Sequence, residues 1–142
     1  MEKLLKEMGM LNTFFKIELY DSDTFLKKGK DRLVFNFSAN KGVPLGPLNK
    51  TASGGELSRI MLALKSILSN YKNLPTIIFD EIDTGVSGEI ANCIGRIMKS
   101  MSINMQVISI THLPQVAAKA NNHLKVFKIT RNEKTSTELK NL

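Results

Sequence analysis

Apolar residues recur at helical spacing in two stretches of the chain, and each stretch predicts an amphipathic helix. The first covers residues 53–71 and the second covers residues 87–101. The positions expected to face a core are Leu57, Ile60, Met61, Leu64, Ile67 and Leu68 in the first helix, and Ile90, Ile94, Ile97, Met98 and Met101 in the second.

Two continuous apolar runs, at 76–80 and 105–110, alternate with these helices. Such runs are typical of parallel strands that are covered on both faces. A strand–helix–strand order also favours a right-handed crossover between parallel neighbours. The fold class expected is therefore α/β, with a mostly parallel sheet flanked by helices.

The flanking segments predict smaller elements. Residues 13–20 and 32–38 are rich in β-forming side chains and predict an antiparallel hairpin near the N-terminus, with a polar turn region at 21–30. Prolines and glycines predict a loop at 39–50. The other expected elements are a helix end at 1–11, a short helix at 113–120, a strand at 123–130 and an edge strand at 134–139.

Length and composition fit one globular domain over residues 1–142. Within it, residues 1–11 are candidates for the end of a coiled coil, 13–38 for the hairpin and 53–130 for the core that carries the chemistry. The single cysteine, Cys93, excludes a disulfide framework and a cysteine-based zinc site. No stretch has the pattern of a signal peptide or the length of a membrane span, so we expect a cytoplasmic protein with no membrane contact.

The net charge of +7 lies on the flanks of the chain. Residues 51–100 carry five basic and five acidic side chains, whereas residues 1–50 carry nine against six and residues 101–142 carry six against two. Two interpretations remain open: a solvated basic surface, or weak, sequence-independent contact with a polyanion such as DNA.

The start of the first long helix combines a cap with an anion site. Ser53 can cap the helix, and Glu56 lies three residues later, where a capping box requires it. Gly54 and Gly55 leave room for a close approach to the backbone. Free N–H groups and the positive end of the helix dipole suit a phosphate, although a structural cap alone explains the same residues.

Three side chains that could take part in catalysis lie at the ends of the two predicted parallel strands. Asp80 and Glu81 end the first strand, and His112 follows the second. Ligands of open α/β sheets gather at the carboxyl ends of strands. Asp80 is placed to hold Mg²⁺, and Glu81 is a candidate general base for water. Taken singly, these residues also fit a solvent-exposed strand end and a structural histidine.

Residues 46–51, GPLNKT, superficially resemble the end of a phosphate-binding P-loop. That motif requires Gly-Lys-Ser/Thr at the start of a helix, whereas Asn49 precedes the lysine here and Pro47 interrupts the loop. We reject this match, and no other stretch of the sequence contains a Walker A motif.

Four stretches within residues 32–120 together resemble the RecN family of bacterial DNA repair ATPases, which is related to the SMC family. They are FSAN at 37–40, ASGGELSR at 52–59, FDEIDTGVSG at 79–88 and ITHLPQVA at 110–117. The resemblance implies the carboxy-terminal lobe of a P-loop NTPase-like, ABC-type ATPase head. It also implies a role in ATP-dependent repair of DNA double-strand breaks and in recombination.

The resemblance also implies roles for individual residues. The ABC signature, which contacts ATP held by an opposing head, matches Ser53, Gly54, Gly55 and Glu56. Walker B matches Asp80 as the Mg²⁺ contact and Glu81 as the catalytic base, Asp83 matches the D-loop, and His112 matches the switch histidine.

The cofactors implied are ATP and Mg²⁺, and the partners are the missing Walker A half of the same head, a second head and DNA. The chain departs from the family in lacking Walker A and most of a coiled coil, so we expect it to be inactive alone.

Two rival interpretations remain. A nucleotide-binding domain of an ABC transporter shares these motifs, but it usually carries a helical subdomain before the signature. Here a β-hairpin and a proline–glycine loop precede it. The other rival is a non-enzymatic basic module that binds DNA, in which the motifs are coincidental.

Overall fold

The computed structural model describes residues 1–69, 71, 74–131 and 133–142. The helices are α1 (Glu2–Glu7), α2 (Leu48–Thr51), α3 (Gly54–Ser69), α4 (Gly88–Met101) and α5 (Pro114–Ala117). The strands are β1 (Phe14–Leu26), β2 (Gly29–Ser38), β3 (Gly46–Pro47), β4 (Thr76–Asp80), β5 (Gln106–Ile110), β6 (Leu124–Arg131) and β7 (Lys134–Asn141).

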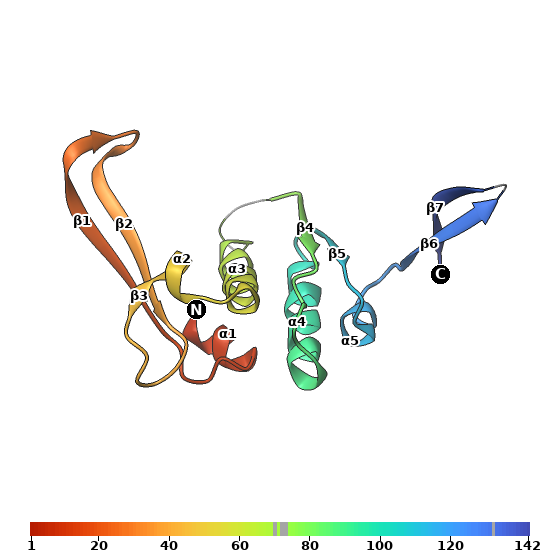
Figure 1. Ribbon diagram of the computed structural model, residues 1–142, viewed down its shortest axis with the longest axis horizontal. Coiled ribbons are helices and arrows are strands. Elements are labelled where there is room, and N and C mark those ends of the chain that lie inside the picture. The colour runs from red at the N-terminus through yellow and green to blue at the C-terminus, as the bar shows by residue number, and fades with distance from the viewer. Residues whose placement is uncertain (70, 72–73, 132) are drawn as a thin grey trace.

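The described strands form three small sheets rather than one. In the middle of the molecule β4 pairs in parallel with β5, and α4 is the crossover between them. The β1–β2 hairpin, extended by β3, and the β6–β7 hairpin are antiparallel and lie at opposite ends of an elongated molecule (Figure 1). The parallel pairing and the hairpin near the N-terminus are confirmed, but within this chain the parallel sheet has only two strands.

The main core forms around α4, whose position between α3 and α5 is visible in Figure 1. Of the inward positions predicted for this helix, Ile94, Ile97, Met98 and Met101 are confirmed as buried, and Ile90 is partly buried against the core. Gly95 allows α5 to approach closely, since a Cβ there would lie 3.3 Å from the carbonyl oxygen of Gln115. The other residues of the core are Leu5, Met8, Met10, Phe37, Ile60, Leu62, Ala63, Ile77, Phe79, Ile82, Ala91, Cys93, Met105 and Val116.

The prediction that both faces of the parallel strands are covered is wrong for this chain. Ile77 and Phe79 are buried on one face of β4, whereas Ile78 on the other face is 59% exposed. Ile108 and Ile110 of β5 are likewise exposed. Among the described residues, helices pack against only one face of the pair, so the other apolar face remains open to solvent.

The face of α3 that points inward also differs from the prediction. Ile60, Leu62 and Ala63 are buried, whereas Leu57, Met61 and Leu68 are 38–39% exposed. Helices α1 and α4 both pack against α3. Only part of the apolar surface of α3 is therefore buried in the core. The helix ends at Ser69, and residue 70 of the predicted range lies outside the described residues.

The polar turn predicted at 21–30 is mostly strand. Strand β1 continues to Leu26, with a register shift between Asp21 and Leu26, and β2 begins at Gly29. An irregularity of this kind accommodates extra residues without ending a strand. The alternation of apolar and polar residues along the sequence does not reveal it. The predicted loop at 39–50 also contains a short pairing of β3 with β2 and the single turn α2.

None of the described helices is long and apolar enough to cross a membrane.

Candidate functional site

The sequence-predicted residues Asp80, Glu81 and His112 lie at the same end of the parallel pair. Asp80 is the last residue of β4 and is in register with Ile110, the last residue of β5. The amide of Glu81 extends this ladder by donating to the carbonyl of Ile110, with an N–O distance of 3.1 Å. His112 follows two residues later and is exposed, as Asp80 and Glu81 are. The expected convergence at one sheet edge is confirmed.

Glu81 has an unusual backbone conformation. Its φ is +46°, in the left-handed region that residues other than glycine rarely adopt. Its carbonyl accepts hydrogen bonds from the Thr84 amide at 3.2 Å and from the Thr84 hydroxyl at 2.9 Å, and these bonds hold the turn. Such conformations cost about 1–3 kcal/mol and occur preferentially at functional sites. The turn therefore holds the Glu81 side chain at the sheet edge at a cost in stability.

Asp83 joins the loop after β4 to the loop after β5. Its side chain is 1% exposed, and its Oδ2 accepts a hydrogen bond from the Thr111 hydroxyl. The same hydroxyl accepts the amide of Leu113 at 3.0 Å. Thr111 thus links Asp83 to the segment that carries His112. Thr111 was not predicted from the sequence, although its position directly before a candidate histidine was a usable signal.

The second carboxylate oxygen of Asp83, Oδ1, is buried and has no hydrogen-bond partner among the described residues. A buried oxygen of this kind is costly unless a donor satisfies it. Asp83 is therefore a stabilising link to Thr111 that retains an unused acceptor.

We expect Thr111→Val to lower the free energy of unfolding by about 1–3 kcal/mol, because it leaves Asp83 without its described donor. Thr111→Ser keeps the hydroxyl and is the matched control, for which we expect a much smaller loss. Urea unfolding of both variants measures the difference. Wild-type stability in Thr111→Val would show that the hydrogen bond to Asp83 does not stabilise this link.

The capping box at the start of α3 is confirmed. The Glu56 carboxylate accepts hydrogen bonds from the Ser53 amide and the Ser53 hydroxyl, both at 2.8 Å, and the Glu56 amide lies 3.4 Å from the Ser53 hydroxyl oxygen. This helix start lies beside the loop after β4, since a Cβ on Gly55 would be 3.7 Å from the Thr84 carbonyl oxygen. A Cβ on Gly54 would meet nothing within 4 Å. Gly54 therefore leaves an open approach to the backbone at this end of the helix.

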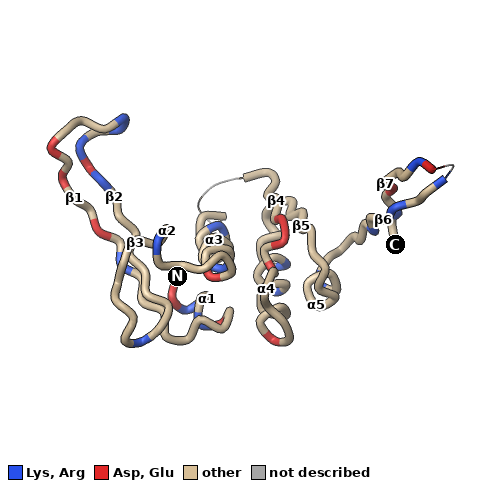
Figure 2. The backbone as a smooth tube through the Cα atoms, viewed as in Figure 1, with Lys and Arg blue, Asp and Glu red and all other residues tan. Residues whose placement is uncertain are grey.

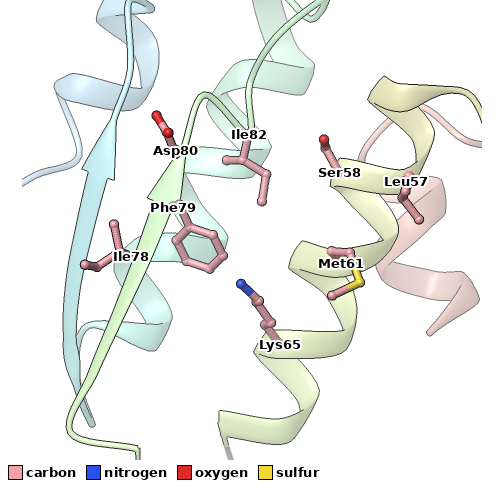
Figure 3. Close-up of a pocket in the computed structure, with 8 residues that line it drawn as sticks. All are labelled: Leu57, Ser58, Met61, Lys65, Ile78, Phe79, Asp80 and Ile82. Atoms are coloured by element: carbon pink, nitrogen blue, oxygen red, sulfur yellow. The ribbon is translucent and has the colours of Figure 1, made fainter.

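A shallow cleft of about 250 Å³ separates α3 from β4 (Figure 3). Its lining residues are Leu57, Ser58, Met61, Lys65, Ile78, Phe79, Asp80 and Ile82. The Lys65 ammonium lies over the ring of Phe79, 5.3 Å from the ring centre. Lys65 was not predicted as a site residue, but its spacing of four from Met61 and eight from Leu57 places all three on one helical stripe.

The donor set fits a magnesium–nucleotide complex only in part. Mg²⁺ in nucleotide sites is held by one or two carboxylates together with phosphate oxygens and water, and exposed Asp80 suits one such position. No group of three or more acidic, histidine or cysteine side chains among the described residues forms a self-contained metal site. The residues present therefore suit a metal that arrives with its nucleotide.

No protein-family model matches the chain. The DNA repair protein RecN of Halalkalibacterium halodurans is 43% identical over 142 residues, covering 97% of this chain and 25% of the relative. The chain is RecN-like along nearly its whole length. The predicted resemblance is confirmed, and the chain spans about a quarter of the length of the curated relatives it matches.

Solved structures with a similar fold are SMC heads. The Smc head domain with a coiled coil and joint from Pyrococcus yayanosii aligns with a TM-score of 0.73 at 20% identity, covering 96% of this chain and 25% of that one. A second structure, from work on the ATP-driven dimerization and DNA-stimulated activation of SMC ATPases, aligns with a TM-score of 0.61 at 20% identity. The alignment covers 99% of this chain and 82% of that one. The predicted fold class, the α/β fold of an SMC-like head, is confirmed for this RecN-like chain.

Proposed function

We propose that this chain is the carboxy-terminal lobe of the ATPase head of a longer, RecN-like DNA repair protein. The observation that carries the proposal is the convergence of Asp80, Glu81 and His112 at one end of β4 and β5, beside the capped start of α3. The whole protein would bind ATP with Mg²⁺ between two heads and use hydrolysis in double-strand-break repair and recombination. It would act in the cytoplasm, at the nucleoid.

Each residue has a proposed role within this head. Asp80 would hold the Mg²⁺ that accompanies ATP, Glu81 would take the proton of the attacking water, and His112 would contact the phosphate edge. When bound, ATP would supply the phosphoryl group and Mg²⁺ would neutralise its developing charge. Asp83, assigned to the D-loop, holds the loop before His112 through Thr111.

The signature residues Ser53, Gly54, Gly55 and Glu56 are proposed to act on nucleotide held by the second head. Ser53 and Gly54 are exposed, and nothing described lies near a Cβ on Gly54. The N–H groups at the start of α3 and the helix dipole favour a phosphate there. This supports a homodimer in which each head completes the site of the other.

The uncovered apolar surfaces support a partner within the same head. Ile78, Ile108 and Ile110 form an exposed apolar face on the parallel pair. Contiguous apolar surface of this kind is costly in water and marks an interface. We assign it to the remainder of the head, which would supply the Walker A motif and further sheet.

The 142-residue chain alone is expected to show no measurable ATPase activity and no tight ATP binding, because the phosphate cradle of Walker A is missing from its sequence. The full-length protein is expected to do both. A phosphate-release assay on the two purified proteins tests this proposal. Turnover by the 142-residue chain that is abolished by Glu81→Gln would contradict it.

A further inference from the structure

The β6–β7 hairpin carries four cations on one face. In its antiparallel register Lys125 is directly opposite Lys140, and Arg131 is directly opposite Lys134. Side chains alternate between the faces of a strand, so both pairs point to the same side. We call this side the basic face, and its residues are Lys125, Phe127, Ile129, Arg131, Lys134, Ser136, Glu138 and Lys140. Figure 2 shows the cations on both strands of this hairpin, at one end of the molecule.

These pairs lower the stability of the hairpin. Like charges directly opposite each other in an antiparallel pair are destabilising, and here the arrangement occurs twice on one face. Glu138 is opposite Phe127, two residues from Lys140, and is the only carboxylate on the basic face. Within the described part of the chain, none of the four cations takes part in an ion pair. A polyanion would supply the missing negative charge.

The opposite face of the hairpin has a different character. Leu124, Val126 and Leu139 share it with Lys128 and are 68%, 62% and 66% exposed, whereas Phe127 and Ile129 on the basic face are half-buried. Apolar surface of this kind favours packing against protein, whereas paired cations favour solvent or an anion. When the apolar face packs against the rest of the head, the basic face is the side that stays accessible.

We propose that the basic face binds the phosphate backbone of duplex DNA, an inference that rests on the proposed function in DNA repair. Six residues of strand separate Lys125 from Arg131, which places the two cation pairs about 20 Å apart. The major groove is about 12 Å wide and admits a two-stranded β-ribbon. The two pairs are therefore spaced to reach the phosphates on either side of a groove, with Phe127 and Ile129 between them. Contacts to phosphates alone carry no sequence information, so binding is independent of sequence.

The test neutralises the four cations in the full-length protein, as K125Q/R131Q/K134Q/K140Q. Binding to a short fluorescent duplex is measured by anisotropy over a range of salt concentrations. Loss of four phosphate contacts is expected to reduce the slope of log K against log salt by about 3–4. Between about 50 and 200 mM salt, the wild type is expected to lose about 10²-fold more affinity than the variant.

The β1–β2 hairpin provides a control with the same change in net charge. Lys27, Lys28, Lys30 and Arg32 near its tip are exposed, but Asp21, Asp23 and Asp31 lie among them. The variant K27Q/K28Q/K30Q/R32Q is expected to reduce the slope much less. Equal slopes in the two variants would overturn the proposal, because net charge alone would then explain binding. A wild-type protein without measurable DNA binding at low salt would overturn it as well.

The single substitution Lys140→Glu separates DNA binding from folding. It places a carboxylate opposite Lys125, so the thermal midpoint is expected to rise while DNA affinity falls. A fall in both would show that the basic face acts through folding only, and would contradict the proposal. ATPase activity measured without DNA keeps the two proposals apart. If K125Q/R131Q/K134Q/K140Q loses DNA binding but retains ATPase activity, the proposed function and the DNA contact of the basic face both stand. Unchanged DNA binding with normal ATPase activity overturns only the DNA contact of the basic face.

Discussion

Glu81→Gln is expected to lower the ATPase rate of the full-length protein by about 10²–10⁴-fold, the usual contribution of a general base. Glutamine has nearly the same size and can keep the turn that Thr84 holds, but it cannot accept the proton of the attacking water. ATP should therefore bind and remain uncleaved. Heads that close on ATP should accumulate as dimers, which light scattering measures as a rise in molar mass.

Two further substitutions identify the cause of that loss. Glu89→Gln removes an exposed carboxylate in the first turn of α4 and is expected to leave the rate unchanged. Glu81→Gly relieves the positive φ of this position, so it is expected to lose activity without losing stability, since glycine adopts this conformation without steric cost. If Glu81→Gln retained the wild-type rate, Glu81 would not be the base.

Ser53→Asp is expected to abolish closure of the two heads while the protein remains folded and still binds ATP at its own Walker A motif. Aspartate caps a helix at least as well as serine, but it cannot donate to the Glu56 carboxylate as the Ser53 hydroxyl does. We therefore expect α3 to remain folded with a small loss of stability. At the proposed contact with the triphosphate of the opposing head, however, it places one negative charge against another. ATPase activity should fall toward background, as measured by phosphate release, and the molar mass should not rise with ATP.

Ser53→Ala and Ser87→Asp are the matched controls. Ser53→Ala removes only the cap, at a cost of about 1 kcal/mol of stability. Ser87 occupies the N-cap position of α4, where its side chain makes no capping hydrogen bond. Aspartate there adds the same charge at a different helix start and is expected to leave closure intact. Normal closure and turnover in Ser53→Asp would mean that Ser53 is a helix cap and nothing else.

The local patterns of the sequence predicted most of the elements and the edge where the candidate residues meet. Strand β4 occupies the predicted residues, and α4 differs from its predicted range by one residue. These predictions succeeded because strand length, apolar runs and the capping box are local signals. Asp80 and His112 were correctly placed together because parallel neighbours share a carboxyl end.

The failures concern interactions between distant residues. The continuous apolar run of β4 correctly indicated a strand, but sequence does not reveal which elements cover Ile78. The link from Asp83 to Thr111 spans 28 residues and depends on how two loops meet. The basic face of β6–β7 depends on the register of the hairpin, which composition alone does not contain. The roles assigned to Ser53, Glu81 and His112 remain predictions.

The most direct test of the proposed function compares Glu81→Gln with the double variant Glu81→Gln/Ser53→Asp in the full-length protein. Molar mass is measured by light scattering without nucleotide and with ATP and Mg²⁺, and ATP binding is measured in parallel. We predict that the mass of the single variant doubles with ATP, and that the mass of the double variant stays at the nucleotide-free value although ATP is bound. If the molar mass doubles in both variants, the result would contradict the proposal that Ser53 contacts the nucleotide held by the opposing head.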